Sequence, residues 1–130
     1  MKKRNELIEE VRGNAIGDIT DASTGDEAFQ NRILRPILEF QNDLFVDVFR
    51  NYLTKHKTDF HSFPVEKKLQ FIENSIQKDI KFRNALKGMI IGWFTSNDFQ
   101  YYIGNSSNLN KRMMNMLIEQ LKSQVLLFEN

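Results

Sequence analysis

The sequence predicts an all-α fold, a single compact bundle of about five or six helices, of which the central one is long and bends at Pro36. Apolar residues recur at spacings of three and four, and no stretch sustains the alternation of a strand. Only two prolines interrupt 130 residues, and 11 Phe supply a core for one domain of this size. We assign residues 1–25 to a short helix with a mobile arm and residues 26–130 to the bundle domain.

The first element is a short helix from Glu6 to Val11 that ends at Gly13, where glycine favours a helix end. The stretch "GNAIGDITDASTGDE" then collects Gly, Asp, Ser and Thr, which predicts a loop or mobile arm.

The central helix is predicted from Asp26 to Lys55. Successive residues turn by about 100°, which gathers its apolar side chains on one broad side. These residues are Phe29, Ile33, Leu34, Ile37, Leu38, Phe40, Leu44, Phe45, Val48, Phe49 and Tyr52. The ring of Pro36 clashes with the preceding helical turn, so it must bend the helix or split it, and we expect a bend.

The next helix is predicted to begin at Pro64, because proline suits a first helical turn. A break near Lys78 and Asp79 separates it from the helix that follows. Thr95 and Asp98 have the spacing of a capping box, which predicts a short helix through "FQYYI". A final helix is predicted to run to about Phe128.

Several amides project into apolar sectors of these helices, namely Gln41 on the central helix and Gln120 and Gln124 on the last one. An unpaired buried amide costs about 1–3 kcal/mol, so these groups need partners. They form either an internal network or a partly open face that meets a partner subunit or a ligand. Met113 and Met116 add a pliable surface to the same sector.

The stretch "GNSSN" at 104–108 is predicted to be the corner between two helices, with Gly104 in a left-handed conformation and a cap at the start of the last helix. A phosphate-binding loop would need a preceding strand and a longer glycine-rich turn. A helix start still attracts anions. The candidate anion contacts are Ser106, Ser107, Asn108, Lys111 and Arg112.

His56, Asp59 and His61 are the candidate metal ligands, but they lack the helical spacing that puts two imidazoles on one face. No serine lies in a nucleophile-elbow motif, and the chain has no cysteine. We therefore predict no metal site, no catalytic residue and no cofactor.

A modest basic run comprises Lys78, Lys81, Arg83 and Lys87, while the net charge of the chain is only +1. Nucleic acid is disfavoured as a partner because affinity grows with the number of phosphates that are neutralised. A membrane span is also disfavoured, since the apolar piece "GMIIGWF" is far shorter than the roughly 20 residues that a spanning helix needs.

The segments "RPILEFQND" (35–43), "ENSIQKDIKFRNALKGMIIGWF" (73–94) and "NSSNLNKRMMN" (105–115) resemble a family of small all-helical bacterial proteins whose activity is not established. Some members are labelled glyoxalase, which implies a lyase that acts on a small molecule. Glyoxalase folds are similar to repeated βαβββ units with His and Glu metal ligands on strands, and this sequence predicts no strands. The resemblance therefore supplies no catalytic residues.

The expected function is that of a non-enzymatic cytoplasmic protein that acts through helix-mediated contacts with itself, as a homodimer, or with another protein. The absence of cysteine fits a reducing compartment. The alternatives are a small-molecule enzyme or sensor, such as the lyase that the resemblance implies, and an accessory protein on nucleic acid.

Overall fold

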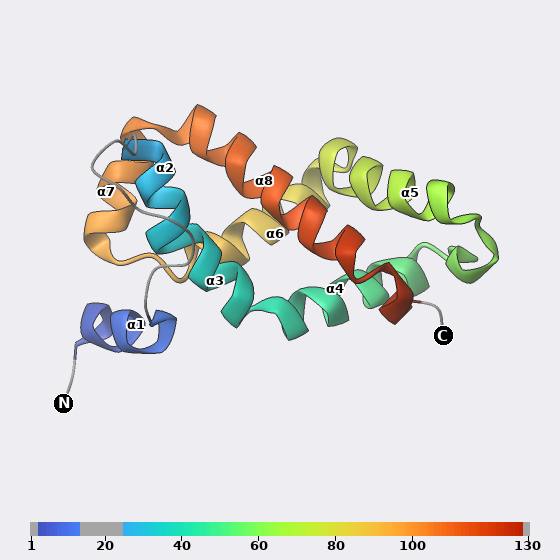
Figure 1. The fold of residues 1–130 in the computed structure, drawn as a ribbon, viewed down its shortest axis with the longest axis horizontal. Helices are drawn as coiled ribbons and strands as arrows, with labels where there is room; N and C mark the ends of the chain where they lie inside the picture. Colours follow the sequence, from blue (N-terminus) through green and yellow to red (C-terminus); the bar gives the residue numbers. More distant parts are fainter. Residues whose placement is uncertain (1–2, 14–24, 129–130) are drawn as a thin grey trace.

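The computed structural model describes residues 3–13 and 25–128, and these ranges contain helices and no strand. The all-α prediction is confirmed (Figure 1). The elements are α1 (Arg4–Arg12), α2 (Gly25–Phe29), the π-helical η1 (Gln30–Leu34), α3 (Arg35–Phe40), α4 (Asn42–Lys55), η2 (Phe60–Ser62), α5 (Val65–Lys78), α6 (Ile80–Ile91), α7 (Ser96–Gly104), α8 (Ser106–Ser123) and η3 (Val125–Phe128). Because α2, η1 and α3 are continuous, the described ranges form seven helices, slightly more than predicted.

The last long helix, α8, runs obliquely across the bundle (Figure 1) and contacts η1, α5, α6 and α7. Its inward side chains Leu109, Met113, Leu117 and Leu121 have no exposed surface. They follow one another every four residues, which places them on one face of the helix. This face forms one side of the core, together with buried residues of α3, α4, α5 and α6.

The predicted bend at Pro36 is not observed, and the chain stays helical through this residue. A π turn precedes it, in which the N–H of Arg35 donates to the carbonyl of Gln30, five residues earlier. The wider turn spreads the carbonyl groups ahead of Pro36, so that its ring is accommodated and its missing N–H breaks no regular α-helical pattern.

The central helix instead divides at Gln41, and α3 and α4 point in different directions on either side of it (Figure 1). Two long-range hydrogen bonds stabilise this corner. The side chain of Gln41 donates to the Met89 carbonyl at 3.3 Å, and Gln120 donates to the Leu38 carbonyl at 3.0 Å. The corner therefore depends on contacts with α6 and α8, which no pattern within the central helix reveals.

The predicted breaks around α6 and α7 are confirmed. Asp79 lies between α5 and α6 and accepts the Phe82 N–H at 3.2 Å. Thr95 and Asp98 form the predicted capping box at the start of α7. These caps satisfy N–H groups that the first helical turn leaves without partners.

The stretch 104–108 is a corner between α7 and α8, as predicted, but its details differ from the prediction. Gly104 is the last residue of α7 and does not take a positive φ. Asn105 precedes α8 without a side-chain cap, and its amide donates instead to the Tyr101 carbonyl at 2.9 Å. The side chain therefore stabilises the end of α7 rather than the start of α8.

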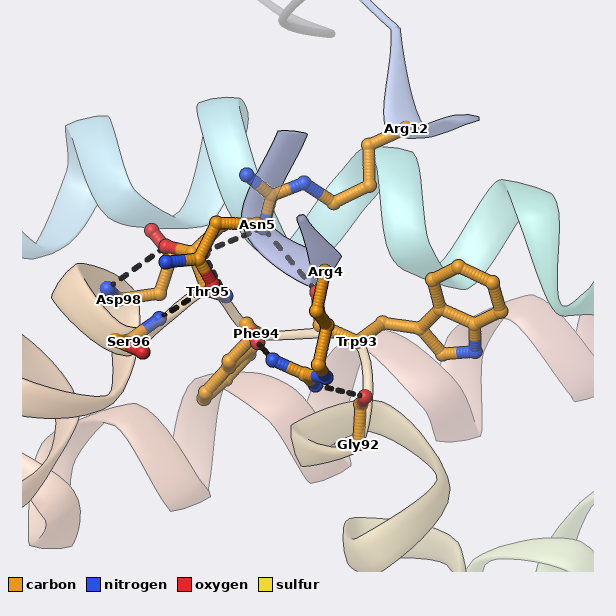
Figure 2. A network of polar contacts seen from close by, with 9 residues as sticks. All are labelled: Arg4, Asn5, Arg12, Gly92, Trp93, Phe94, Thr95, Ser96 and Asp98. Carbon is orange, nitrogen blue, oxygen red and sulfur yellow. Dashed lines mark hydrogen bonds and ion pairs between the residues drawn. The ribbon is translucent and has the colours of Figure 1, made fainter. Parts of the chain in front are cut away.

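The first helix extends from Arg4 to Arg12 and ends at Gly13, which has a φ of 73°. The predicted arm at residues 14–24 lies outside the described residues. Figure 2 shows three α1 side chains on the turn between α6 and α7. Arg4 donates to two carbonyls of this turn at 2.9 and 2.8 Å, and Asn5 accepts a turn N–H at 3.2 Å. Arg12 pairs with Asp98 at 2.6 Å.

The Arg12–Asp98 ion pair is nearly buried, with 7% and 12% of the two side chains exposed. Arg12→Met leaves the Asp98 carboxylate without its cation, and we expect the free energy of unfolding to fall by roughly 1–3 kcal/mol. Urea denaturation measures this change, and hydrogen exchange in α1 reports its undocking.

Glu9→Gln is the matched control because it changes the charge of α1 by one at an exposed position. Its unfolding free energy should stay within about 0.5 kcal/mol of the wild type. Equal urea midpoints for Arg12→Met and the wild type would contradict a stabilising role for the pair.

Candidate functional site

A groove of about 720 Å³ lies between the α3–α4 corner and the second half of α8. Both walls are helical, and most lining residues are polar or charged, with Leu38, Phe40 and Met116 as the apolar ones. The lining residues are Arg35, Leu38, Glu39, Phe40, Asn42, Asp43, Asn115, Met116, Glu119, Gln120, Ser123 and Gln124.

Three amides form a hydrogen-bonded trio in this groove, with Asn42 at its centre. The Asn42 side-chain oxygen accepts from Gln120 at 2.8 Å and from Gln124 at 2.7 Å. The Asn42 amide nitrogen donates to the Gln124 oxygen at 2.7 Å. All three residues are half-buried, so these bonds replace water and hold α8 against the start of α4.

The structure brings together only part of the predicted interface set. Gln120, Gln124 and Met116 line the groove. Gln41 lies next to α6, where it donates to Met89, and Met113 is fully buried in the core.

The rim of the groove is acidic. Glu39, Asp43 and Glu119 are exposed lining residues, whereas the cation among the lining residues is Arg35. The Arg35 Nε donates to the Asn31 side-chain oxygen at 2.8 Å. Phe40 adds an apolar side chain that is 48% exposed. Lys122, which is not a lining residue, lies 3.9 Å from the Glu119 carboxylate. The groove thus combines an apolar contact with a rim on which carboxylates outnumber cations.

Sequence reasoning did not single out Asn42 or the rim carboxylates. The spacing of Glu39 and Asp43, four residues apart, indicates a shared helical face. No comparable signal marks Asn42, because its role depends on a corner that only tertiary contacts create.

The candidate anion contacts on α8 face two different directions. Asn108 and Arg112 turn towards α2 and η1, where Arg112 donates to the Gln30 side chain at 2.8 Å. Ser107 and Lys111 line a separate pocket beside α6. Ser106 is half-buried at the first position of the helix. The structure does not gather all five residues around one point.

Asp26 connects α2 with α7 and α8. Its carboxylate accepts the Tyr101 hydroxyl at 2.6 Å and the Asn108 amide. These hydrogen bonds, that from Tyr101 first, hold the pKa of Asp26 below its ordinary value of 3.8. The same bond raises the pKa of Tyr101 to about 12. A Cβ at Gly25 would lie 2.6 Å from the Tyr101 hydroxyl oxygen, so a residue without a side chain allows this approach.

The candidate metal ligands are largely exposed. The His61 Nδ1 lies 3.0 Å from the Asp59 carboxylate, with 69% and 67% of the side chains exposed. The His56 ring packs on Tyr52, with 4.2 Å between ring centroids. Across residues 3–13 and 25–128, no group of three His, Asp or Glu residues is placed to hold a metal ion.

Searches among known proteins gave no match to a protein-family model, a curated protein or a solved structure. Within the described ranges, no helix has the length and apolar character needed to cross a membrane.

Asn42→Ala removes the centre of the amide trio and leaves Gln120 and Gln124 without their shared partner. We expect the free energy of unfolding to fall by about 1–2 kcal/mol. Urea denaturation measures this, with Asn115→Ala as the control. Asn115 lines the same groove, is exposed and makes no side-chain hydrogen bond in the described part of the chain. Equal losses for both variants would contradict the central role of Asn42.

Tyr101→Phe removes a hydrogen bond whose strength depends on pH. Because the folded-state pKa of Asp26 is lowered, the stabilisation is present above the ordinary pKa of 3.8 and is lost as pH falls through the folded value. The stability difference between the wild type and Tyr101→Phe should therefore shrink as pH falls from about 5 to about 2. Urea midpoints over this range test it, and a constant difference would contradict it.

Proposed function

We propose that the protein is a non-enzymatic, cytoplasmic helical protein that binds a basic amphipathic helix of a partner protein in the groove between the α3–α4 corner and α8. The observation that carries this proposal is the composition of the groove. The lining holds three exposed carboxylates and one guanidinium, with the half-exposed Phe40 among them, and the Lys122 ammonium 3.9 Å from Glu119 offsets part of one negative charge.

The dimensions of the groove fit a helical occupant. Its α8 wall extends from Asn115 to Gln124, and nine steps at 1.5 Å give a length of roughly 14 Å, about two and a half helical turns. An amphipathic helix places anchors at spacings of three, four and seven on one face, and such helices bind in grooves with apolar walls. Phe40 and Met116 offer apolar contacts for such anchors.

The charge of the rim favours a basic partner over a second copy of the chain. A twofold contact places the same surface of both copies together. Glu39, Asp43 and Glu119 would then face their own equivalents, which costs free energy. Lysine or arginine side chains of another protein would instead meet carboxylates of opposite charge.

Trp93 provides a direct readout of binding because it is the only tryptophan of the chain. Its ring centroid lies 4.6 Å from that of Phe40, which lines the groove. The probe is an amphipathic helical peptide of Leu and Lys, about 18 residues long, which is five turns. We expect it to change the emission of Trp93, more strongly at low ionic strength. The matched peptide of Leu and Glu should leave the emission unchanged.

Paired variants locate the binding site. Glu39→Gln combined with Asp43→Asn should weaken binding of the Leu–Lys peptide by roughly threefold to tenfold, the size expected for exposed charges. Asp47→Asn is the control for the loss of a negative charge, because Asp47 lies on α4 outside the groove lining.

Equal binding of both peptides, or an equal loss in Asp47→Asn, would contradict the proposal. Molecular mass from light scattering tests whether a second copy of the chain occupies the groove instead. A dimer whose dissociation constant changes in the double variant, but not in Asp47→Asn, would show that a second copy fills the groove and would overturn the assignment of a basic partner.

A further inference from the structure

A second pocket, of about 350 Å³, lies on another side of α8, where the first half of this helix meets the end of α5 and the start of α6. Apart from Asn115, none of its lining residues belongs to the groove described above. The lining residues are Gln77, Arg83, Lys87, Ser107, Asn110, Lys111, Met114 and Asn115.

Three cations converge on this pocket from two helices. Arg83 and Lys87 are four residues apart on α6 and share one face, while Lys111 approaches from α8. None of the described lining residues is Asp or Glu, and none of these three cations forms an ion pair within the described ranges. A chain with a net charge of +1 thus concentrates positive charge here without a protein counter-ion.

Two hydrogen bonds orient donors around the pocket. The Asn110 side-chain oxygen accepts the Tyr102 hydroxyl at 2.7 Å, which leaves the N–H groups of the same amide as donors. Arg83 donates through one nitrogen to the Gln77 carbonyl at 3.1 Å, and the other nitrogens of its guanidinium remain as donors. Ser107 adds a hydroxyl near the positive end of the α8 dipole.

We infer that this pocket binds a small phosphorylated molecule. Its phosphoryl group contacts Arg83, Lys87 and Lys111, because guanidinium and ammonium groups are the strongest donors to phosphate oxygens. Its organic part packs on Met114, the buried apolar residue of the lining. The volume lies at the lower end of the range for small-molecule sites.

A small molecule fits this pocket better than a nucleic acid strand. Binding to a strand requires cations in a line that follows several phosphates. The other two residues of the basic run, Lys78 and Lys81, do not line the pocket. The remaining three cations line one pocket, which suits a single phosphoryl group.

The test is isothermal titration calorimetry of the full chain with three probes: inorganic phosphate, AMP and adenosine. We expect AMP to bind, phosphate to bind more weakly and adenosine not to bind. Lys111→Gln should weaken AMP binding by roughly tenfold or more, as expected for the loss of a charge-assisted hydrogen bond. Arg83→Gln should have a similar effect. Lys111 is exposed, and its side chain forms no hydrogen bond or ion pair within the described ranges, so Lys111→Gln should fold normally.

Lys81→Gln is the matched control, because it removes the same charge from α6 outside the pocket. Unchanged AMP binding in Lys81→Gln supports the assignment, whereas an equal loss would show a diffuse charge effect and overturn it. Absence of binding by both phosphate and AMP would overturn it as well. Tight binding of an oligothymidylate that weakens in Lys78→Gln and Lys81→Gln would assign the surface to nucleic acid instead. These outcomes do not depend on the acidic groove, so the two proposals fail separately.

Discussion

Burial of one face of α8 is the constraint on which the rest of the structure depends. Leu109, Met113, Leu117 and Leu121 have no exposed surface, and the helix that carries them contacts four other elements. Because this face points into the core, the side chains on the two flanks of α8 have fixed directions as well. Second-half residues on one side line an acidic groove, and first-half residues on another side line a basic pocket. Both proposed sites follow from the orientation of a single helix.

Local signals in the sequence predicted most helix boundaries. The capping box of Thr95 and Asp98 and the break at Asp79 involve residues three positions apart, so the interactions are contained in short stretches. The central helix was predicted less well, because Pro36 is accommodated by a π turn and the division at Gln41 depends on side chains of distant helices. Periodicity reports which face is apolar, not where a second helix supplies a hydrogen bond.

Prediction of the two sites from the sequence was limited in the same way, because both depend on contacts between distant helices. The apolar sector around Gln120 and Gln124 was visible from spacing, yet Asn42, which binds both, belongs to a helix about 80 residues earlier. The sequence shows the basic run of Lys78, Lys81, Arg83 and Lys87 as one stretch. Lys78 is the last residue of α5, and the break at Asp79 separates it from the other three, which lie on α6. Along α6, Lys81 lies two steps of about 100° before Arg83, so Arg83 and Lys87 line the pocket and Lys81 does not. Which flank meets which neighbour is decided by tertiary packing.

The docking of α1 has a consequence for the order in which parts of the chain can fold. Its hydrogen bonds to the α6–α7 turn join residues 81 to 91 positions apart. Translation adds roughly 5–20 residues per second, so this helix waits roughly 4 to 18 seconds for its binding surface to be synthesised. A helix of nine residues is marginal in water until it docks. This helix is therefore synthesised well before the surface on which it docks, and its stability depends on residues 81 to 91 positions later in the chain.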